Sequence, residues 1–279
     1  MVLAVEGVGV RLGGRQVLSE VCFDIGAGEL TGLIGSNGAG KTTLFRVILG
    51  LLAPSAGRVT LEGRPLRRGN RLIGYVPQKI SLDPDAPLRA RDLVALGLDG
   101  HRLGFALPSA PRRRRVEEML EAVDATGFAD SRVGTLSGGE AQRVMIAHAL
   151  IGGPKLLLAD EPLANLDIGS GQEVTALLTR LAREQNVAVL ISAHEINPLL
   201  PVMDRVVYLA GGRAASGPVE QVVTSETLSG LYGHRVEVLH VHGRILVVAG
   251  PTEPDEYTET AVHHGGHEFE DREPSGTSW

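Results

Sequence analysis

The sequence predicts an α/β fold, and three observations support that prediction. Two short apolar runs, at 30–34 and 156–159, have the length and composition of strands buried in a parallel sheet. The first run leads through a glycine-rich loop into a segment of helical character over 43–52. A stretch of helical periodicity from Leu88 to Ile151 separates the two runs. We therefore expect a sheet whose strands are interrupted along the chain by a helical subdomain at about 84–153.

The remaining elements follow in order along the chain. Short strands with glycine-rich turns occupy 2–35, and a further strand covers 58–62. A helix is predicted over 169–185, and the apolar run 187–192 reads as a buried strand. Two hairpins are predicted near the end, one formed by 206–209 and 214–216, the other by 236–241 and 245–248. The tail from Pro251 is acidic and rich in Pro, Gly, Ser and Thr, which predicts disorder.

Composition narrows the class of protein. The chain has 279 residues, of which 43% are hydrophobic and 22% charged, enough for a sizeable core. Cys22 is the single cysteine, so no intramolecular disulfide can form, and a reducing cytoplasm is the expected setting. The net charge of −6 argues against general nucleic-acid binding. We expect no signal peptide, and no apolar run approaches the ~20 residues that span a bilayer. Any membrane association is therefore expected to occur through another protein.

The glycine-rich loop at 35–43 fits the phosphate-binding pattern G-x-x-x-x-G-K-[ST]. Glycines let successive backbone N–H groups turn toward an anion, and the following helix adds its positive N-terminal end. Lys41 would reach the β- and γ-phosphates of ATP, and the Thr42 hydroxyl would bind Mg²⁺. A chance glycine-rich loop is the alternative, which the flanking strand and helix disfavour. The residues of the loop are Gly35, Ser36, Asn37, Gly38, Ala39, Gly40, Lys41, Thr42 and Thr43.

A second motif, Leu136 to Glu140 followed by Gln142 and Arg143, resembles the signature of ATP-binding cassette (ABC) ATPases. It also reads as an ordinary helix cap, with Ser137 as the capping residue and Glu140 three positions on. We expect both readings to hold. The resemblance implies that Ser137, Gly138 and Gly139 serve the γ-phosphate of a partner subunit's ATP, and hence a homodimer with nucleotide between two copies. Glu140 replaces the commoner Gln, a change also seen among importer ATPases.

Two adjacent carboxylates, Asp160 and Glu161, end the second apolar run. Ligands bind at the carboxyl edge of an open α/β sheet, where this pair is expected to lie. The pair resembles the end of the Walker B strand of the same family, in which the Asp holds Mg²⁺ through water and the Glu orients or deprotonates the attacking water. A solvated turn is the alternative, and the two preceding motifs disfavour it.

Three weaker motifs resemble further parts of the family pattern. Gln78 resembles the glutamine that contacts Mg²⁺ or water and links the nucleotide to the helical subdomain. The segment 164–167 resembles the loop that crosses the dimer interface, and His194 resembles the switch histidine that contacts the γ-phosphate. Each is more often structural when taken singly, but their order and spacing match the stronger motifs. The implied catalytic set is Lys41, Gln78, Glu161 and His194, and the implied Mg²⁺ set is Thr42, Gln78 and Asp160.

The resemblance covers about residues 2 to 235 and implies a P-loop NTPase (RecA-like) core. An antiparallel β subdomain and an inserted α-helical signature subdomain complete the implied fold. On this division, residues 1–235 form the ATPase domain, 236–250 a C-terminal hairpin appendage, and 251–279 the acidic tail.

One position departs from the family pattern. An aromatic residue usually stacks on adenine near the end of the first strand, and the aligned residue here is Leu12. Leucine can cover a base but has no π face, so we expect discrimination between ATP and GTP to stay within about tenfold. The alternative is that Leu12 packs in the sheet and another side chain holds the base.

The segment 194–200 resembles the ATPases of zinc, manganese and iron importers, as does the hairpin with its histidines. The implied role is the ATPase subunit of a metal-ion importer, peripheral on the cytoplasmic face of the membrane. Its implied partners are permease subunits and, indirectly, an extracytoplasmic substrate-binding protein. The alternatives are an exporter ATPase and a soluble ABC ATPase acting on nucleic acid or ribosomes. A soluble ABC ATPase of this kind usually has two cassettes or a long coiled coil, and the sequence predicts neither here. The histidines in question are His234, His240 and His242.

The motifs described so far do not account for two clusters of arginines or for the histidines of the C-terminal tail. A solvated surface is the favoured reading of the arginines. Contact with anionic lipid or an acidic loop of a membrane partner comes second, and DNA binding last. The tail histidines could bind a transition metal, but chance histidines in a polar tail are favoured. The residues are Arg64, Arg67, Arg68 and Arg71, Arg112 to Arg115, and His263, His264 and His267.

Overall fold

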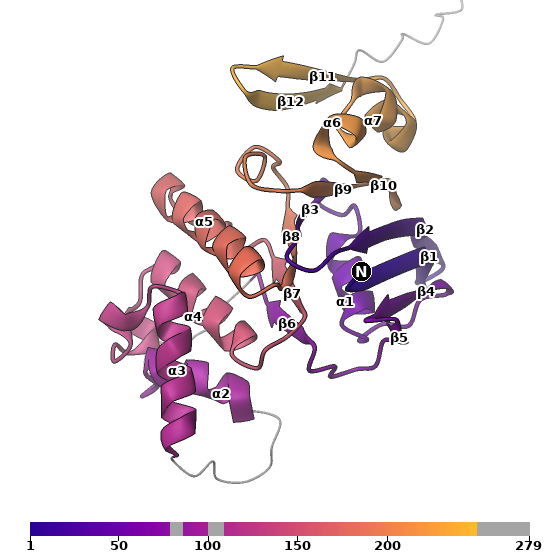
Figure 1. Cartoon of the computed structure of the whole chain (residues 1–279). Coiled ribbons are helices and arrows are strands. Elements are labelled where there is room, and N and C mark those ends of the chain that lie inside the picture. The colour runs from indigo at the N-terminus through magenta and orange to yellow at the C-terminus, as the bar shows by residue number, and fades with distance from the viewer. Residues whose placement is uncertain (79–85, 100–108, 250–279) are drawn as a thin grey trace, which may run out of the picture.

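The computed structural model describes residues 1–78, 86–99 and 109–249. Its central element is a six-stranded sheet in the order β10-β9-β3-β8-β7-β6. The five strands from β9 to β6 are parallel, and β10 is antiparallel to β9. Figure 1 shows this sheet at the centre of the molecule. The strands are β3 (Leu30–Ile34), β6 (Ile73–Val76), β7 (Leu156–Asp160), β8 (Ala188–Ala193), β9 (Arg205–Ala210) and β10 (Arg213–Gly217).

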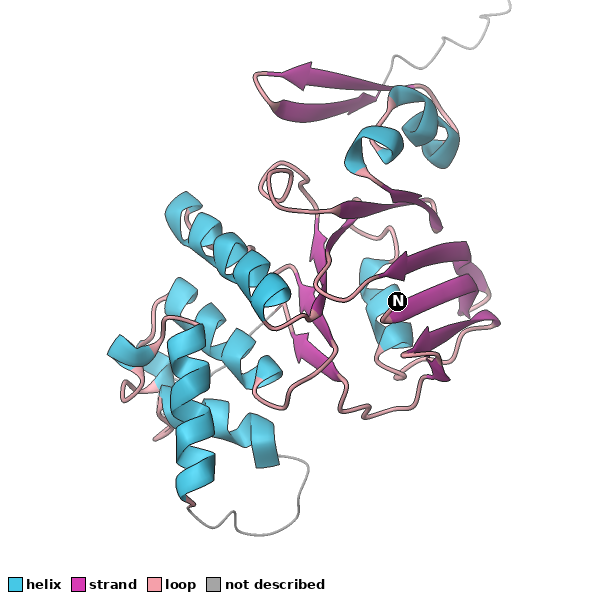
Figure 2. Cartoon of the chain, viewed as in Figure 1, coloured by secondary structure: helices cyan, strands magenta, loops and turns pink. Residues whose placement is uncertain are grey.

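A second, antiparallel sheet covers one face of the first and has the order β2-β1-β4-β5. Helix α1 (Lys41–Ile48) lies between the two sheets (Figure 2). Its apolar side chains Leu44, Phe45 and Ile48 are buried together with residues of both sheets, because they recur on one side of the helix. The strands of this sheet are β1 (Leu3–Leu12), β2 (Arg15–Ile25), β4 (Ala56–Leu61) and β5 (Arg64–Pro65).

Helices cover the other face of the parallel sheet. Successive side chains of a strand point to opposite faces, so Leu157 and Ala159 pack in the cluster that includes α4 and α5, while Leu156 and Leu158 pack in the cluster that includes α1. The helices are α2 (Ala90–Asp99), α3 (Ala110–Ala122), α4 (Gly138–Leu150) and α5 (Ile168–Glu184), with 3-10 turns at Thr126–Phe128 and Val133–Thr135. In the chain, α2, α3 and α4 come between β6 and β7, as predicted.

The C-terminal part comprises α6 (Val219–Val222), α7 (Ser225–Tyr232) and a separate hairpin of β11 (Val236–Val241) and β12 (Arg244–Ala249). Both predicted hairpins are confirmed. The turn of the second is His242-Gly243, and both residues have a positive φ, as the type I′ hairpin turn requires. Figure 1 places β11 and β12 at one end of the molecule, next to α6 and α7.

Most sequence-based boundaries hold within a few residues. The strand at 30–34 is confirmed as β3, whereas the helix expected over 43–52 begins at Lys41 and ends at Ile48. The tail 251–279, with His263, His264 and His267, lies outside the described residues, and the division into domains stays a prediction. Arg113 and Arg114 are exposed on α3, which agrees with a solvated surface. Within the described part of the chain, no helix is both long and apolar enough to cross a bilayer.

Candidate active site

The carboxyl ends of three adjacent parallel strands bring the predicted residues together. Strand β3 leads into the glycine-rich loop and α1, β7 ends at Asp160 with Glu161 next, and β8 lies between β3 and β7. Because parallel strands end at the same sheet edge, side chains that are far apart in sequence meet here. Gln78 reaches the same edge from the end of β6.

Two glycines of the loop, Gly35 and Gly40, lie where a larger residue would displace neighbouring atoms or strain the backbone. A Cβ atom on Gly35 would lie 2.4 Å from the main-chain oxygen of Leu209, so the backbone approach excludes a side chain there. Gly40 has a φ of 110° at the N-terminus of α1, and its added Cβ would lie 2.7 Å from Leu18. The side chains of Ser36, Asn37 and Thr42 are exposed around this loop.

Lys41 is buried in the centre of the site, with 6% of its side chain exposed. Its Nζ donates hydrogen bonds to the carbonyl oxygens of Gly35 (2.6 Å) and Ser36 (3.3 Å) and lies 3.8 Å from Oε1 of Glu161. Burial lowers the pKa of Lys41, because desolvation penalises the ammonium, while the charges of Glu161 and Asp160 act in the opposite direction. The ammonium is thus held beneath the loop, facing both carboxylates.

A buried serine, which the sequence analysis did not single out, holds the two carboxylate residues in place. The Ser192 hydroxyl donates to Oδ1 of Asp160 at 2.6 Å and accepts the main-chain N–H of Glu161 at 2.9 Å. Ser192 lies on β8 and is fully buried. A polar residue near the end of an apolar strand was the available signal, but only strand pairing reveals that Ser192 is opposite Asp160.

Tyr75 is a second residue that the sequence analysis did not assign. Its hydroxyl lies 3.4 Å from Oδ2 of Asp160. Burial raises the pKa of Tyr75, and the negative charge of Asp160 raises it further. Tyr75 therefore stays neutral and can donate a hydrogen bond to the carboxylate.

Glu161 is fixed by its backbone and by its neighbours. Its φ of 47° lies in the left-handed region, which is uncommon for a residue other than glycine and is concentrated at functional sites. The Gln78 side chain donates to Oε2 of Glu161 at 2.7 Å. Gln78 and Lys41 consequently both contact the carboxylate of Glu161.

Other predicted site residues do not join this cluster. His194 follows β8 and is 56% exposed, and its contact is with Glu195 at 3.8 Å. Ser137 caps α4, and its main-chain N–H and side chain form the predicted capping box with Glu140. Gly138 and Gly139, at the first turn of α4, lie close to Leu166, just before α5, and to Ser170 in the first turn of α5. Leu12, at the end of β1, is 42% exposed and is not packed inside the sheet.

A cavity of about 440 Å³ adjoins the glycine-rich loop. Its walls are the start of β2, the loop itself and the turn between β9 and β10. Leu12 is not among the residues that line it. The lining residues are Arg15, Gln16, Val17, Ser36, Asn37, Gly38, Ala39, Gly211 and Gly212.

The site fits a nucleoside triphosphate with a divalent cation. The loop has no room for a side chain at Gly35, requires a positive φ at Gly40 and carries a lysine at its base, a combination suited to phosphate oxygens. The hydroxyl of Thr42, the carboxylate of Asp160 and the amide of Gln78 supply oxygen atoms, the ligands that Mg²⁺ prefers. Glu161 adds a carboxylate next to this set that can accept a proton from water.

Comparison with known proteins agrees with this geometry. The family model described as ABC transporter matches residues 18–164. The chain is 33% identical over 229 residues to the manganese transport system ATP-binding protein MntB of Listeria innocua, covering 82% of this chain and 95% of that protein. It is 34% identical over 272 residues to the zinc import ATP-binding protein ZnuC of Pseudomonas fluorescens, covering 94% and 98%.

Comparison with solved structures also identifies an ABC transporter subunit as a structural relative. CbiO1 of Clostridium perfringens, part of the ABC transporter complex CbiONQ, is 30% identical and superposes with a TM-score of 0.70. The match covers 81% of this chain and 92% of that one. The α/β architecture of the two sheets and the helical part is therefore that of solved cassette structures.

Proposed function

The chain belongs to the ABC transporter family, whose ATP-binding subunits hydrolyse ATP, and we propose that it is the ATPase subunit of an importer for a transition-metal ion such as zinc or manganese. The observation that carries the ATPase part is the cluster of Lys41, Gln78 and Glu161 at the sheet edge. The metal-ion part rests on relatives named for manganese and zinc transport, which match over most of their length.

The contacts of the cluster suggest a role for each residue. Lys41 would exchange the carbonyls of Gly35 and Ser36 for the β- and γ-phosphate oxygens of ATP. Thr42, Gln78 and Asp160 would hold Mg²⁺, which, when bound, neutralises phosphate charge. Glu161, next to Lys41 and Gln78, would orient the attacking water and accept its proton.

Hydrolysis would require a second copy of the chain. Ser137 and Gly139 begin α4 and lie outside the cluster around Glu161, so they are free to contact the γ-phosphate bound by a partner subunit. His194 is exposed at the same sheet edge as Glu161 and would contact the γ-phosphate of the ATP bound by its own chain once the two copies close. Closure of the dimer would move the helical part, and thereby the permease that it contacts.

The proposed assembly is a homodimer of this chain bound to integral membrane permease subunits, with an extracytoplasmic binding protein delivering the metal. The subunit would lie on the cytoplasmic face of the membrane. The relatives' names describe ATP-binding proteins of transport and import systems, which supports partners of this kind.

Metal accumulation in cells tests this function. We expect cells without the chain to accumulate less zinc or manganese, measured by elemental mass spectrometry after growth in metal-poor medium. The wild-type gene should restore accumulation, and Glu161→Gln should not. Unchanged content of every transition metal, together with retention of some other solute, would favour the exporter alternative. If the chain purifies together with an integral membrane protein, it is an importer or exporter subunit and not a soluble ATPase.

A further inference from the structure

The cavity of about 440 Å³ beside the glycine-rich loop offers space for the nucleoside part of a nucleotide whose phosphates occupy the loop. The loop residues Ser36 to Ala39 form one of its walls, so a ligand whose phosphates occupy the loop extends directly into it. Its volume falls within the range of about 300–1,000 Å³ that is usual for small-molecule sites. The wall opposite the loop, formed by the start of β2 and the β9–β10 turn, then decides how the base is held.

That wall offers few groups that can bind a base. The Gln16 side chain is already engaged, because it accepts a hydrogen bond from Arg11 at 2.7 Å and donates one to the Leu18 carbonyl. Val17 is half-buried and presents an aliphatic surface, and the two glycines of the β9–β10 turn have no side chains. None of the lining residues is aromatic.

Arg15 differs from these neighbours. It is exposed, lines the cavity and forms no hydrogen bond or ion pair with any residue that the structure describes. Its position is set by a tight turn, because Gly13 and Gly14 both have positive φ and join β1 to β2. In that hairpin Leu12 is the direct cross-strand partner of Arg15, so their side chains are neighbours on one face of the sheet.

We propose that the guanidinium of Arg15 stacks on the adenine ring and does what an aromatic side chain at position 12, where this chain has Leu12, would do. A planar, weakly hydrated guanidinium is attracted to the face of a π system, and Leu12 beside it would supply apolar contact to the edge of the base. Val17 would contact the base or ribose from the same wall. This inference rests on ATP binding at the loop and does not depend on which ion is transported.

Binding measurements with two ligands test the proposal. The affinities of wild type, Arg15→Ala and Arg15→Lys for Mg·ATP and for inorganic tripolyphosphate, which has no base, should be compared by calorimetry. Arg64→Ala is the matched control, because Arg64 is an exposed arginine of β5 that does not line this cavity. We expect Arg15→Ala to weaken ATP binding about fivefold and to leave tripolyphosphate binding unchanged. Arg15→Lys should recover only part of the loss.

Two results would overturn the proposal. Equal weakening of both ligands by Arg15→Ala, with recovery in Arg15→Lys, would show that the arginine contacts phosphate. An unchanged ATP affinity would show that it contacts neither part. Tripolyphosphate binding by the wild-type chain, and its loss in Lys41→Ala, tests the loop separately, so a failure there counts against the proposed ATPase function.

Discussion

The side-chain amide of Asn197 is hydrogen-bonded twice to the main chain of Ile245. Its Oδ1 accepts the Ile245 N–H at 2.8 Å, and its Nδ2 donates to the Ile245 carbonyl at 3.0 Å. Asn197 thereby occupies the free edge of β12 in the way that a neighbouring strand would. The segment that follows His194 and the C-terminal hairpin, which the sequence presents as two separate features, are in direct contact.

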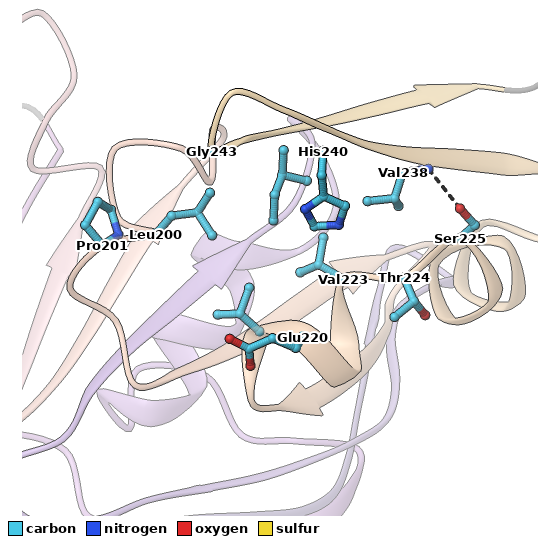
Figure 3. A pocket seen from close by; sticks show the side chains of 11 residues that line it. Leu200, Pro201, Glu220, Val223, Thr224, Ser225, Val238, His240 and Gly243 are labelled. Atoms are coloured by element: carbon cyan, nitrogen blue, oxygen red, sulfur yellow. Dashed lines mark hydrogen bonds between the residues drawn. The ribbon is translucent and has the colours of Figure 1, made fainter.

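The opposite edge of the hairpin is held by two serines of α7. The Ser229 hydroxyl accepts the N–H of Val236 at 2.9 Å, and the Ser225 hydroxyl accepts the N–H of Val238 at the same distance. Figure 3 shows the second of these contacts beside the cavity of about 580 Å³ under the hairpin, where His240 lies between Val238 and Gly243. Side chains thus satisfy main-chain groups on both edges of a two-stranded sheet.

Asn197→Ala should loosen the hairpin, because the half-buried N–H and carbonyl of Ile245 lose their partners. We expect a loss of about 1 to 3 kcal/mol in the free energy of opening of this region. Amide hydrogen exchange of residues 236–249 should then be faster. Asn197→Asp keeps the acceptor and loses the donor, so its exchange rate should lie between those of the wild type and Asn197→Ala. Wild-type exchange in Asn197→Ala would contradict this account of the anchoring.

Ser192→Ala should affect both stability and turnover. The substitution removes the hydroxyl that links Asp160 to the main chain of Glu161 in a fully buried position. We expect a loss of about 1 to 3 kcal/mol in unfolding free energy. The maximal ATPase rate should fall more than the apparent affinity for ATP, since Glu161 loses its placement while the loop stays intact. Urea unfolding and steady-state kinetics measure both, and Ser192→Cys, with a weaker donor, should be intermediate. Wild-type values for Ser192→Ala would refute the bridging role.

Glu161→Gln should keep ATP binding and lose turnover. The amide has nearly the same shape as the carboxylate but cannot accept a proton from water. We expect the steady-state ATPase rate to fall by on the order of 10²-fold. A closed dimer should accumulate in ATP and be visible by size-exclusion chromatography. Glu117→Gln on the exposed side of α3 is the matched control. Normal turnover in Glu161→Gln would remove Glu161 from the proposed mechanism.

Ser137→Arg should block dimerisation and leave the ATP affinity of the monomer nearly unchanged. Bulk and positive charge at the N-terminus of α4 oppose the approach of a second nucleotide-bound copy. Ser137→Ala is the control, because it removes the helix cap, at a cost of about 1 kcal/mol, without adding bulk. Nucleotide titration measures ATP binding by the monomer, and size-exclusion chromatography in ATP measures dimerisation. A large loss of monomer affinity would mean that the signature serves ATP bound to its own chain.

Local patterns in the sequence were enough to predict the glycine-rich loop, the capping box at Ser137 and the strand that ends at Asp160. Each depends on residues within one turn, one cap or one strand: positive φ at Gly40, a side-chain acceptor three residues before Glu140, an apolar run of strand length. These requirements are met by neighbours in the chain. They can therefore be read without knowing how the strands are ordered.

Only the tertiary structure decided which distant residues complete the site. The contact between Ser192 and Glu161 spans 31 positions, that between Gln78 and Glu161 spans 83, and that between Asn197 and Ile245 spans 48. The first two arise because β7 pairs with β8 and with β6, which places the ends of these strands side by side, and the third arises because the separate hairpin packs against the segment that follows β8. Such packing results from burial of whole apolar faces. No residue pattern within a single segment encodes it.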